Sequence, residues 1–333
     1  MEYLIVQQYL IFLLGVMITA GIIKDNNLLG DLFILIDDIS SKRLKLFLIS
    51  LIGGILPIPG RVTLSAGILD SLAPNKGKER EKFGIVDYIS THHYYLWSPL
   101  EKTVILPMAV LSITYGNYIS YMWPLVLITF LYIAWYIFYI VKEEDLVLNI
   151  NTKIFDFRSF VKGSLPLILG ILFLASGYNP AILFTVITIY YIISNRHSIK
   201  NISSYINWHL VILLAIILVI SVFAKSHFAL FEQLLENNHS IIFASILAFG
   251  ASWLMGSSGK YASLASLLIL VFGQQYLVWF LTIEFIAYNL SPTHKCIHIG
   301  RMYFGTSVKE YFKVIVLWQI LLFVYAFIST FIL

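Results

Sequence analysis

Two basic residues follow glycines inside apolar segments, where a charge has few partners. The first is Arg61 in residues 60–66 (GRVTLSA), and the second is Lys260 in residues 259–265 (GKYASLA). A cation at the centre of a membrane costs about 2.5–3.5 kcal/mol or more, so each should have a counter-charge. A small anion bound between them would supply it, and helix N-termini at these positions would add N–H donors.

Both cations also have a structural explanation. A long basic side chain can extend to the membrane interface, or it can pair with a fixed carboxylate such as Asp70 or Glu284. Small hydroxyl side chains near the cations could coordinate Na⁺ or an anion, but such residues also pack between membrane helices. These hydroxyl residues are Thr63, Ser65, Ser252, Ser257, Ser258 and Ser263. Substrate binding and structural pairing both stay open.

One carboxylate lies inside an apolar run. Glu284 has apolar neighbours on both sides within residues 276–290, and burial favours the uncharged form of a carboxyl group. We therefore predict a proton-coupling role for Glu284, with a structural role as the partner of a lysine or arginine as the alternative. Asp70 and His294 are further candidates for ion or proton coupling.

Four histidines raise the question of a metal site or a catalytic site: His92, His93, His294 and His298. Because His92 and His93 are adjacent and no H-E-x-x-H pattern occurs, nothing places two ligands on one helix face. We predict no metal site, no cofactor beyond a coupling ion, and no enzymatic activity. The rival prediction is an intramembrane enzyme in which a histidine acts with Asp70, which requires groups within hydrogen-bond reach. A channel or a receptor is a third class.

The elements that position these residues are membrane helices. Of the 333 residues 59% are hydrophobic and only 12% are charged, whereas charge approaches a quarter of a soluble domain. Apolar runs of roughly 20 residues recur along the chain, so we predict one all-α membrane domain over residues 1–333, multi-pass in the cell (plasma or inner) membrane. The bilayer is the expected partner and nucleic acid is not. The single cysteine, Cys296, excludes an intrachain disulfide.

We predict about 9–11 helices. Continuous runs predict spans over residues 3–23, 103–120, 122–141, 159–175, 181–194, 206–223, 275–290 and 311–332. Two further runs are interrupted, residues 45–74 by Pro57, Pro59 and Gly60, and residues 239–273 by the glycines at 256 and 259. Lys and Arg gather in alternate loops, which are expected to be cytoplasmic.

The interrupted runs belong to an internal similarity. Each is followed by a Ser-Pro pair, Ser98-Pro99 and Ser291-Pro292, and a lysine lies four residues after each serine. The loop charges place the ends of the first interrupted run inside and those of the second outside. We therefore predict two inverted repeats, about residues 24–141 and 205–333, each with a re-entrant hairpin and a Ser-Pro broken helix. Two separately kinked helices are the alternative.

The predicted substrate-binding residues surround the two hairpin tips and the two Ser-Pro breaks. They are Gly60, Arg61, Thr63, Ser65, Ser98, Lys102, Ser257, Ser258, Gly259, Lys260, Ser291 and Lys295. The predicted coupling residues are Asp70, Glu284 and His294.

Residues 53–60 (GGILPIPG) with Ser65-Ala66 and Asp70, and residues 290–296 (LSPTHKC) with residues 303–305 (YFG), resemble the integral-membrane family called domain of unknown function 401. That family is grouped with the ion transporter superfamily. The resemblance implies paired re-entrant hairpins, coupling to Na⁺ or H⁺, and a homodimer. Together with the two cations, it predicts a secondary active transporter of a small organic or inorganic anion that works by alternating access.

Overall fold

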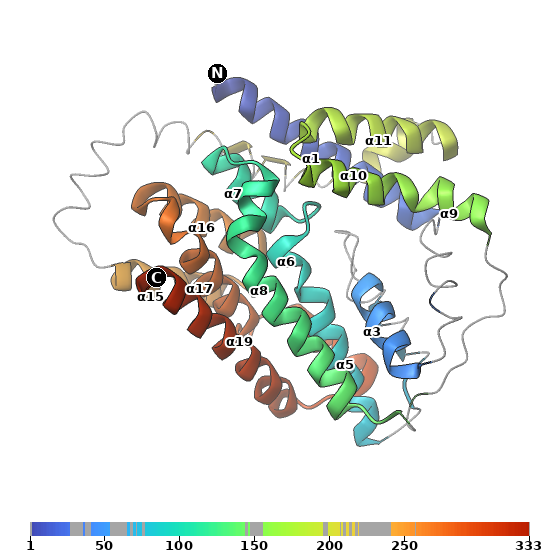
Figure 1. The fold of residues 1–333 in the computed structure, drawn as a ribbon, viewed down its shortest axis with the longest axis vertical. Helices are drawn as coiled ribbons and strands as arrows, with labels where there is room; N and C mark the ends of the chain where they lie inside the picture. Colours follow the sequence, from blue (N-terminus) through green and yellow to red (C-terminus); the bar gives the residue numbers. More distant parts are fainter. Residues whose placement is uncertain are drawn as a thin grey trace.

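The described part of the chain is helical. The computed structural model describes residues 2–26, 36, 41–53, 65–66, 69–70, 72–74, 77–143, 146, 156–195, 199–206, 208, 211–212, 215–216, 219, 241–256 and 258–332. Every regular element within these residues is a helix (Figure 1), which confirms the predicted all-α class.

One group of helices contains the N-terminus. It consists of α1 (Glu2–Asp25), α9 (Phe157–Gly163), α10 (Leu165–Ala175) and α11 (Pro180–Asn195), at the upper right of Figure 1. Helices α1 and α11 cross closely, since a Cβ on Gly15 would lie 3.1 Å from the Cβ of Phe184. The hydroxyls of Thr19 and Thr188 share a hydrogen bond of 3.0 Å at the same crossing. Small residues and hydroxyls of this kind join helices in membranes.

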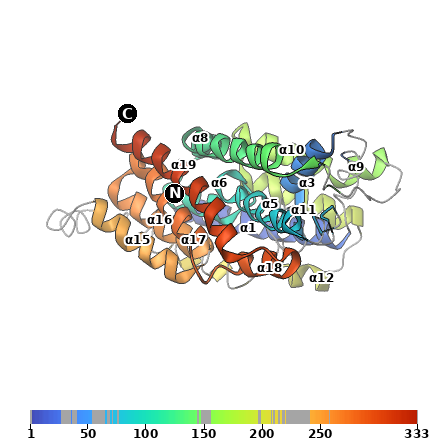
Figure 2. The same ribbon diagram turned by 90° about the horizontal axis from the view of Figure 1, so that it is seen from below.

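The second group contains most of the remaining chain. Its helices are α3 (Lys42–Gly53), α5 (Lys78–His92), α6 (Tyr94–Trp97), α7 (Lys102–Leu111), α8 (Tyr115–Trp135, extended by a π-helical turn to Ile140), α15 (Ile241–Met255), α16 (Ser258–Phe272), α17 (Leu277–Asn289), α18 (Lys295–Phe304) and α19 (Val308–Phe331), with the short α12 (Ile199–Ser204) elsewhere. Helix α17 is central: it packs against α15, α16 and α19 and all its residues are buried. Figure 2 shows α18 beside α5.

Two helical stretches in the described residues are long and apolar enough to cross a membrane. They are Tyr115–Ile140 and Val308–Phe331, and five shorter helices are also apolar. Large apolar side chains face outward on several helices; Ile193 on α11 is 71% exposed and Leu254 on α15 is 69% exposed. Soluble monomers rarely expose apolar patches of this extent, so membrane association is the simplest explanation of this surface.

The breaks at the two Ser-Pro pairs have the same local geometry. The carbonyl of Ser98 accepts a hydrogen bond from the backbone N–H of Glu101 at 2.9 Å, and that of Ser291 accepts one from His294 at 3.2 Å. Proline disfavours helical backbone at the residue before it, which is the serine in both cases. Helices α7 and α18 begin directly after these turns and each has 10 residues.

The two 10-residue helices also end alike. Ser112 after α7 and Gly305 after α18 adopt left-handed backbone, with φ of 57° and 70°. Two residues later Thr114 and Ser307 cap the next helix, each side chain accepting a hydrogen bond from the backbone N–H three residues on. An N-cap hydroxyl satisfies one of the unpaired donors of a first turn, so α8 and α19 begin in the same way.

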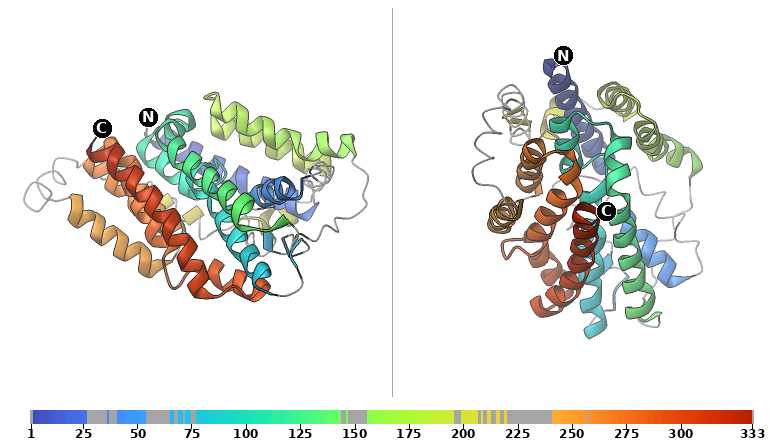
Figure 3. Two further views of the ribbon diagram at one scale, coloured as in Figure 1. Left: turned by 60° about the horizontal axis from the view of Figure 1, so that its bottom comes forward. Right: turned by 60° about the vertical axis from the view of Figure 1, so that its left-hand side comes forward.

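Helices α8 and α19 lie side by side and antiparallel (Figure 3). The indole N–H of Trp318 donates to the hydroxyl of Thr129 at 3.1 Å, and the hydroxyl of Tyr132 donates to the carbonyl of Val314 at 2.7 Å. Residue numbers therefore rise along α8 as they fall along α19.

One predicted span is wrong at its boundary. The span predicted over residues 103–120 is divided, because the left-handed backbone of Ser112 ends α7 and Thr114 caps α8. The span predicted over residues 159–175 is an apolar helical stretch over Phe160–Leu174, with a turn at Ser164 between α9 and α10 and Pro166 in the first turn of α10. A proline is favourable in a first turn, where its missing N–H would have no partner.

The two interrupted runs differ in how much of them is described. Helices α15 and α16 are separate, with Gly256 between them, as the glycines predicted. In the first run α3 ends at Gly53, and residues 54–64 with Pro57, Pro59 and Gly60 lie outside the described residues.

Candidate functional site

The end of α15 packs against the break between α17 and α18. The hydroxyl of Ser291 donates to the carbonyl of Trp253 at 2.6 Å, and the indole N–H of Trp253 donates to the carbonyl of Leu290 at 3.0 Å. Gly256 has φ of +53°, and a Cβ there would lie 2.2 Å from the hydroxyl of Thr293. Only glycine combines this backbone with this close approach. We call residues 252–256, Glu284 and residues 290–294 the junction.

Glu284 is a fully buried carboxyl group at the junction. It lies on α17 and is 0% exposed. The hydroxyl of Ser252, near the end of α15, donates to Oε2 of Glu284 at 2.6 Å. Oε1 has no hydrogen-bond partner among the described side chains. A buried carboxyl group with one oxygen unsatisfied is unfavourable unless a proton or cation joins it.

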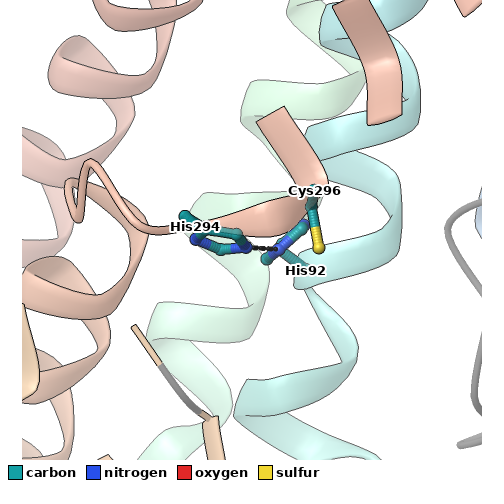
Figure 4. Close-up of side chains that lie close together, drawn as sticks. All are labelled: His92, His294 and Cys296. Carbon is teal, nitrogen blue, oxygen red and sulfur yellow. Dashed lines mark hydrogen bonds between the residues drawn. The ribbon is translucent and has the colours of Figure 1, made fainter. Parts of the chain in front are cut away.

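His294 connects the junction to helix α5. Its Nε2 lies 2.9 Å from Nε2 of His92 (Figure 4), and both histidines are buried. The ring of Tyr88 stacks on His92 with centroids 4.1 Å apart, and the ring of Tyr288 lies 4.2 Å from that of His294. The two imidazole rings are tilted 56° to one another, with centroids 4.8 Å apart, and are held between the two tyrosine rings.

The thiol of Cys296 lies next to this histidine pair. The Sγ of Cys296 and one ring nitrogen each from His92 and His294 all lie within 4.8 Å of one another (Figure 4). Cys296 is partly exposed and belongs to the first turn of α18. Imidazole nitrogen and thiolate sulfur are the ligands that zinc prefers, so these three residues could hold a metal ion.

The family described as "Protein of unknown function (DUF401)" matches residues 2–333. The chain belongs to this family. This confirms the resemblance expected from residues 53–60 and 290–296. No curated protein matches the chain. The description of DUF401 assigns no substrate or reaction, so a function for this chain has to be argued from its own residues.

Several of the predicted binding residues of this DUF401 chain lie outside the residues that the structure describes. Gly60, Arg61, Thr63 and Ser257 are not among the described residues, and only the backbone is described for Ser258, Lys260 and Lys295. The backbone of Ser258, Gly259 and Lys260 forms the first turn of α16, and that of Lys295 begins α18. Their binding roles stay predictions.

The other predicted binding residues are described. Ser98 and Ser291 are buried at the two breaks, and Ser65 is also buried. Lys102 is partly buried at the start of α7. Of these residues Ser291 belongs to the junction, where its hydroxyl donates to the carbonyl of Trp253. The structure therefore places one predicted serine at the junction and leaves the pairing of the two hairpin tips a prediction.

Asp70 has a structural partner. It forms an ion pair with Arg80 of α5. The same guanidinium donates to the carbonyl of Tyr303 at 2.8 Å and lies 5.7 Å from the ring centre of Phe304. Arg80 thus ties Asp70 to the end of α18, and this contact explains Asp70 without a coupling role.

The histidines separate into different environments. His93 accepts a hydrogen bond from the indole N–H of Trp97 at 2.8 Å, and His298 is exposed on α18. Of the four candidate histidines, all of which the structure describes, His92 and His294 converge. The sequence offered one signal for this histidine pair, the four-residue spacing of Tyr88 and His92 on one helix face, but nothing in it indicated that the start of α18 would bring His294 next to them.

The Ser291→Ala variant is expected to weaken the junction. It removes the hydrogen bond to the carbonyl of Trp253, and such bonds contribute about 0.5–1.5 kcal/mol. The midpoint of thermal unfolding in detergent should fall accordingly. Ser176→Ala is the control, because the exposed Ser176 bonds only to the carbonyl of Leu172 in its own helix. Equal loss of stability in both variants would contradict the assignment of Ser291 to the junction.

Proposed function

We propose that this chain is a secondary active transporter of a small organic or inorganic anion, coupled to H⁺ or Na⁺. The observation that carries the proposal is Glu284, a fully buried carboxyl group bonded by Ser252 where α15 meets the break between α17 and α18. Secondary transporters bind substrate and coupling ion at broken helices within the membrane. Intramembrane carboxyl groups are costly and are typically functional.

The paired breaks support an inverted repeat. The features of α7 and α18, from the Ser-Pro turn to the left-handed end and the cap of the next helix, follow in the same order and at the same spacing. Tyr95 and Tyr288, 193 residues apart, occupy matching positions in the two series, and their hydroxyls lie 3.4 Å apart. Matching residues that touch each other are expected at a two-fold axis. The antiparallel packing of α8 and α19 has the sense that an inverted pair requires.

The anion is inferred from charge. Lys260 lies in the first turn of α16, four residues after Gly256 of the junction. The N-terminus of a helix carries free N–H groups and a positive partial charge, which favour an anion. With Arg61 at the tip of the first hairpin, the site would present two cations to a carboxylate or oxyanion. Re-entrant hairpins, multi-pass insertion in the plasma or inner membrane, and a homodimer are parts of the same proposal.

Transport by this mechanism is binding and release without bond cleavage, so we do not assign an enzymatic activity. The rival hypothesis of an intramembrane enzyme requires catalytic groups within hydrogen-bond reach, and His92 and His294 meet that requirement. The carboxylate that the hypothesis places beside them, Asp70, is instead paired with Arg80. A channel would let an anion equilibrate without accumulating it. Accumulation against a gradient therefore distinguishes the transporter from both.

The purified protein in liposomes is expected to accumulate a labelled carboxylate or oxyanion when an inward H⁺ or Na⁺ gradient is imposed. Arg61→Ala should abolish this accumulation because one counter-charge to the anion is lost. Arg158→Ala is the matched control, since Arg158 is exposed on α9. The proposal would be contradicted if no tested anion were taken up under either gradient, or if wild type and Arg61→Ala took up the anion equally.

A further inference from the structure

The histidine pair next to the junction has an unusual pattern of donors and acceptors, which begins with His92. Its Nδ1 lies 2.6 Å from the carbonyl oxygen of Tyr88. A carbonyl only accepts hydrogen bonds, so Nδ1 must carry the proton. The hydroxyl of Thr91, 3.2 Å from the same nitrogen, donates its own proton to the carbonyl of Asp87 at 2.7 Å. The neutral ring of His92 therefore has its lone pair on Nε2.

His294 is oriented in the same way by different residues. Its Nδ1 lies 3.0 Å from the carbonyl oxygen of Tyr288 and 3.2 Å from the hydroxyl of Tyr88. The side-chain N–H of Asn289 donates to the carbonyl of Phe285 at 2.9 Å, which turns its Oδ1 toward Tyr88. The hydroxyl of Tyr88 can then donate to Asn289 and accept from His294. Nδ1 of His294 carries the proton, and its lone pair is also on Nε2.

Two lone pairs therefore face each other across 2.9 Å. Two neutral imidazoles repel in this arrangement unless a cation lies between them. A metal ion accepts both lone pairs, and a carbonyl bonded to each Nδ1–H is the usual support of a metal-binding histidine.

The geometry points to a transition-metal site in which Nε2 of His92, Nε2 of His294 and Sγ of Cys296 bind one ion of the zinc class. Two nitrogens on one tetrahedral Zn²⁺ lie about 3.3 Å apart, given Zn–N bonds of about 2.0–2.1 Å. The two Nε2 atoms are thus within a few tenths of an ångström of that spacing. The thiolate offsets part of the charge of the ion, and a fourth position is left for water or another ligand.

The three ligands differ in their exposure to solvent, and this difference suits reversible binding of an ion. His92 and His294 are buried and fixed by backbone carbonyls, whereas Cys296 is partly exposed. An ion can therefore reach the site from the thiol side. Because His294 belongs to both this site and the junction, a bound ion would fix the break between α17 and α18.

The thiol itself supplies the test. Cys296 is the single cysteine of the chain, so modification by an alkylating reagent, followed by intact mass, reports on this site alone. In the purified full-length protein, Zn²⁺ at about 100 times its Kd should slow alkylation about 100-fold, because the free thiol is reduced by that factor. Mg²⁺, which prefers oxygen ligands, should not slow it.

Variants and Co²⁺ decide which residues bind. His294→Ala and His92→Ala should remove the protection by Zn²⁺, and His298→Ala, which changes an exposed histidine on the same helix, should keep it. Co²⁺ should give a thiolate charge-transfer band in the wild type that is absent in Cys296→Ser. Failure of Zn²⁺ to slow alkylation of the wild type, or protection that survives in both His92→Ala and His294→Ala, overturns the proposal. The wild-type measurement decides the question even where a variant does not fold.

Discussion

Replacing Gly300 with alanine is expected to destabilise the protein strongly. Helix α18 crosses α5 at this residue, and Tyr311 of α19, which is fully buried, fills the crossing. A Cβ on Gly300 would lie 1.9 Å from the hydroxyl oxygen of Tyr311 and 3.1 Å from its Cζ. Overpacking of a filled core costs about 1–3 kcal/mol. The midpoint of thermal unfolding in detergent should fall, with loss of the monodisperse peak in size-exclusion chromatography.

The double variant Gly300→Ala, Tyr311→Phe should recover most of this loss. Tyr311→Phe removes the hydroxyl that the new methyl group would meet and keeps the ring, so the two changes should couple favourably in a double-mutant cycle. Gly250→Ala is the control: a Cβ at this position of α15 meets no atom within 4 Å, and alanine favours helix over glycine. An unchanged stability of Gly300→Ala would mean that Tyr311 of α19 does not lie against α18 in the way described.

The helical membrane-like character of the chain was predictable from the sequence because it depends on composition and on run length. The same holds for the division of α15 from α16, since a glycine with left-handed backbone leaves a local signal. Glu284 is buried, as its apolar neighbours on α17 predicted. Each of these features is determined by residues that are neighbours in the sequence, so it could be predicted without knowing how the helices pack.

Features that depend on helix packing were not predictable in this way. The absence of a metal site was argued from the adjacent pair His92 and His93, yet His93 bonds to Trp97 while His92 meets His294, 202 residues away. No local pattern indicates which of two adjacent histidines faces a distant helix. The boundary at Ser112 was missed for a related reason, because serine in left-handed backbone is uncommon and the apolar run continues past it.

Glu284→Gln is expected to uncouple transport from the proton gradient. Glutamine has nearly the same shape and can still accept a hydrogen bond from the hydroxyl of Ser252, but it cannot take up and release a proton. Coupling between two ligands typically changes affinity about 5–150-fold. An inward H⁺ gradient should therefore stimulate anion uptake by a factor in that range in the wild type, and it should not stimulate uptake in the variant. Exchange of internal for external anion, which needs no net proton movement, should persist. Both rates are measured in the same liposomes.

The pair of measurements separates a coupling role of Glu284 from a structural one. If Glu284 serves only to neutralise a buried cation, the glutamine variant leaves that charge unpaired, and the loss of an ionic partner inside a protein costs about 3–5 kcal/mol. Thermal stability and exchange would then fall together with uptake. Glu143→Gln, at an exposed position beyond α8, should alter neither rate. Loss of gradient-driven uptake with exchange intact therefore assigns the proton to Glu284, because a merely structural carboxylate cannot produce that combination.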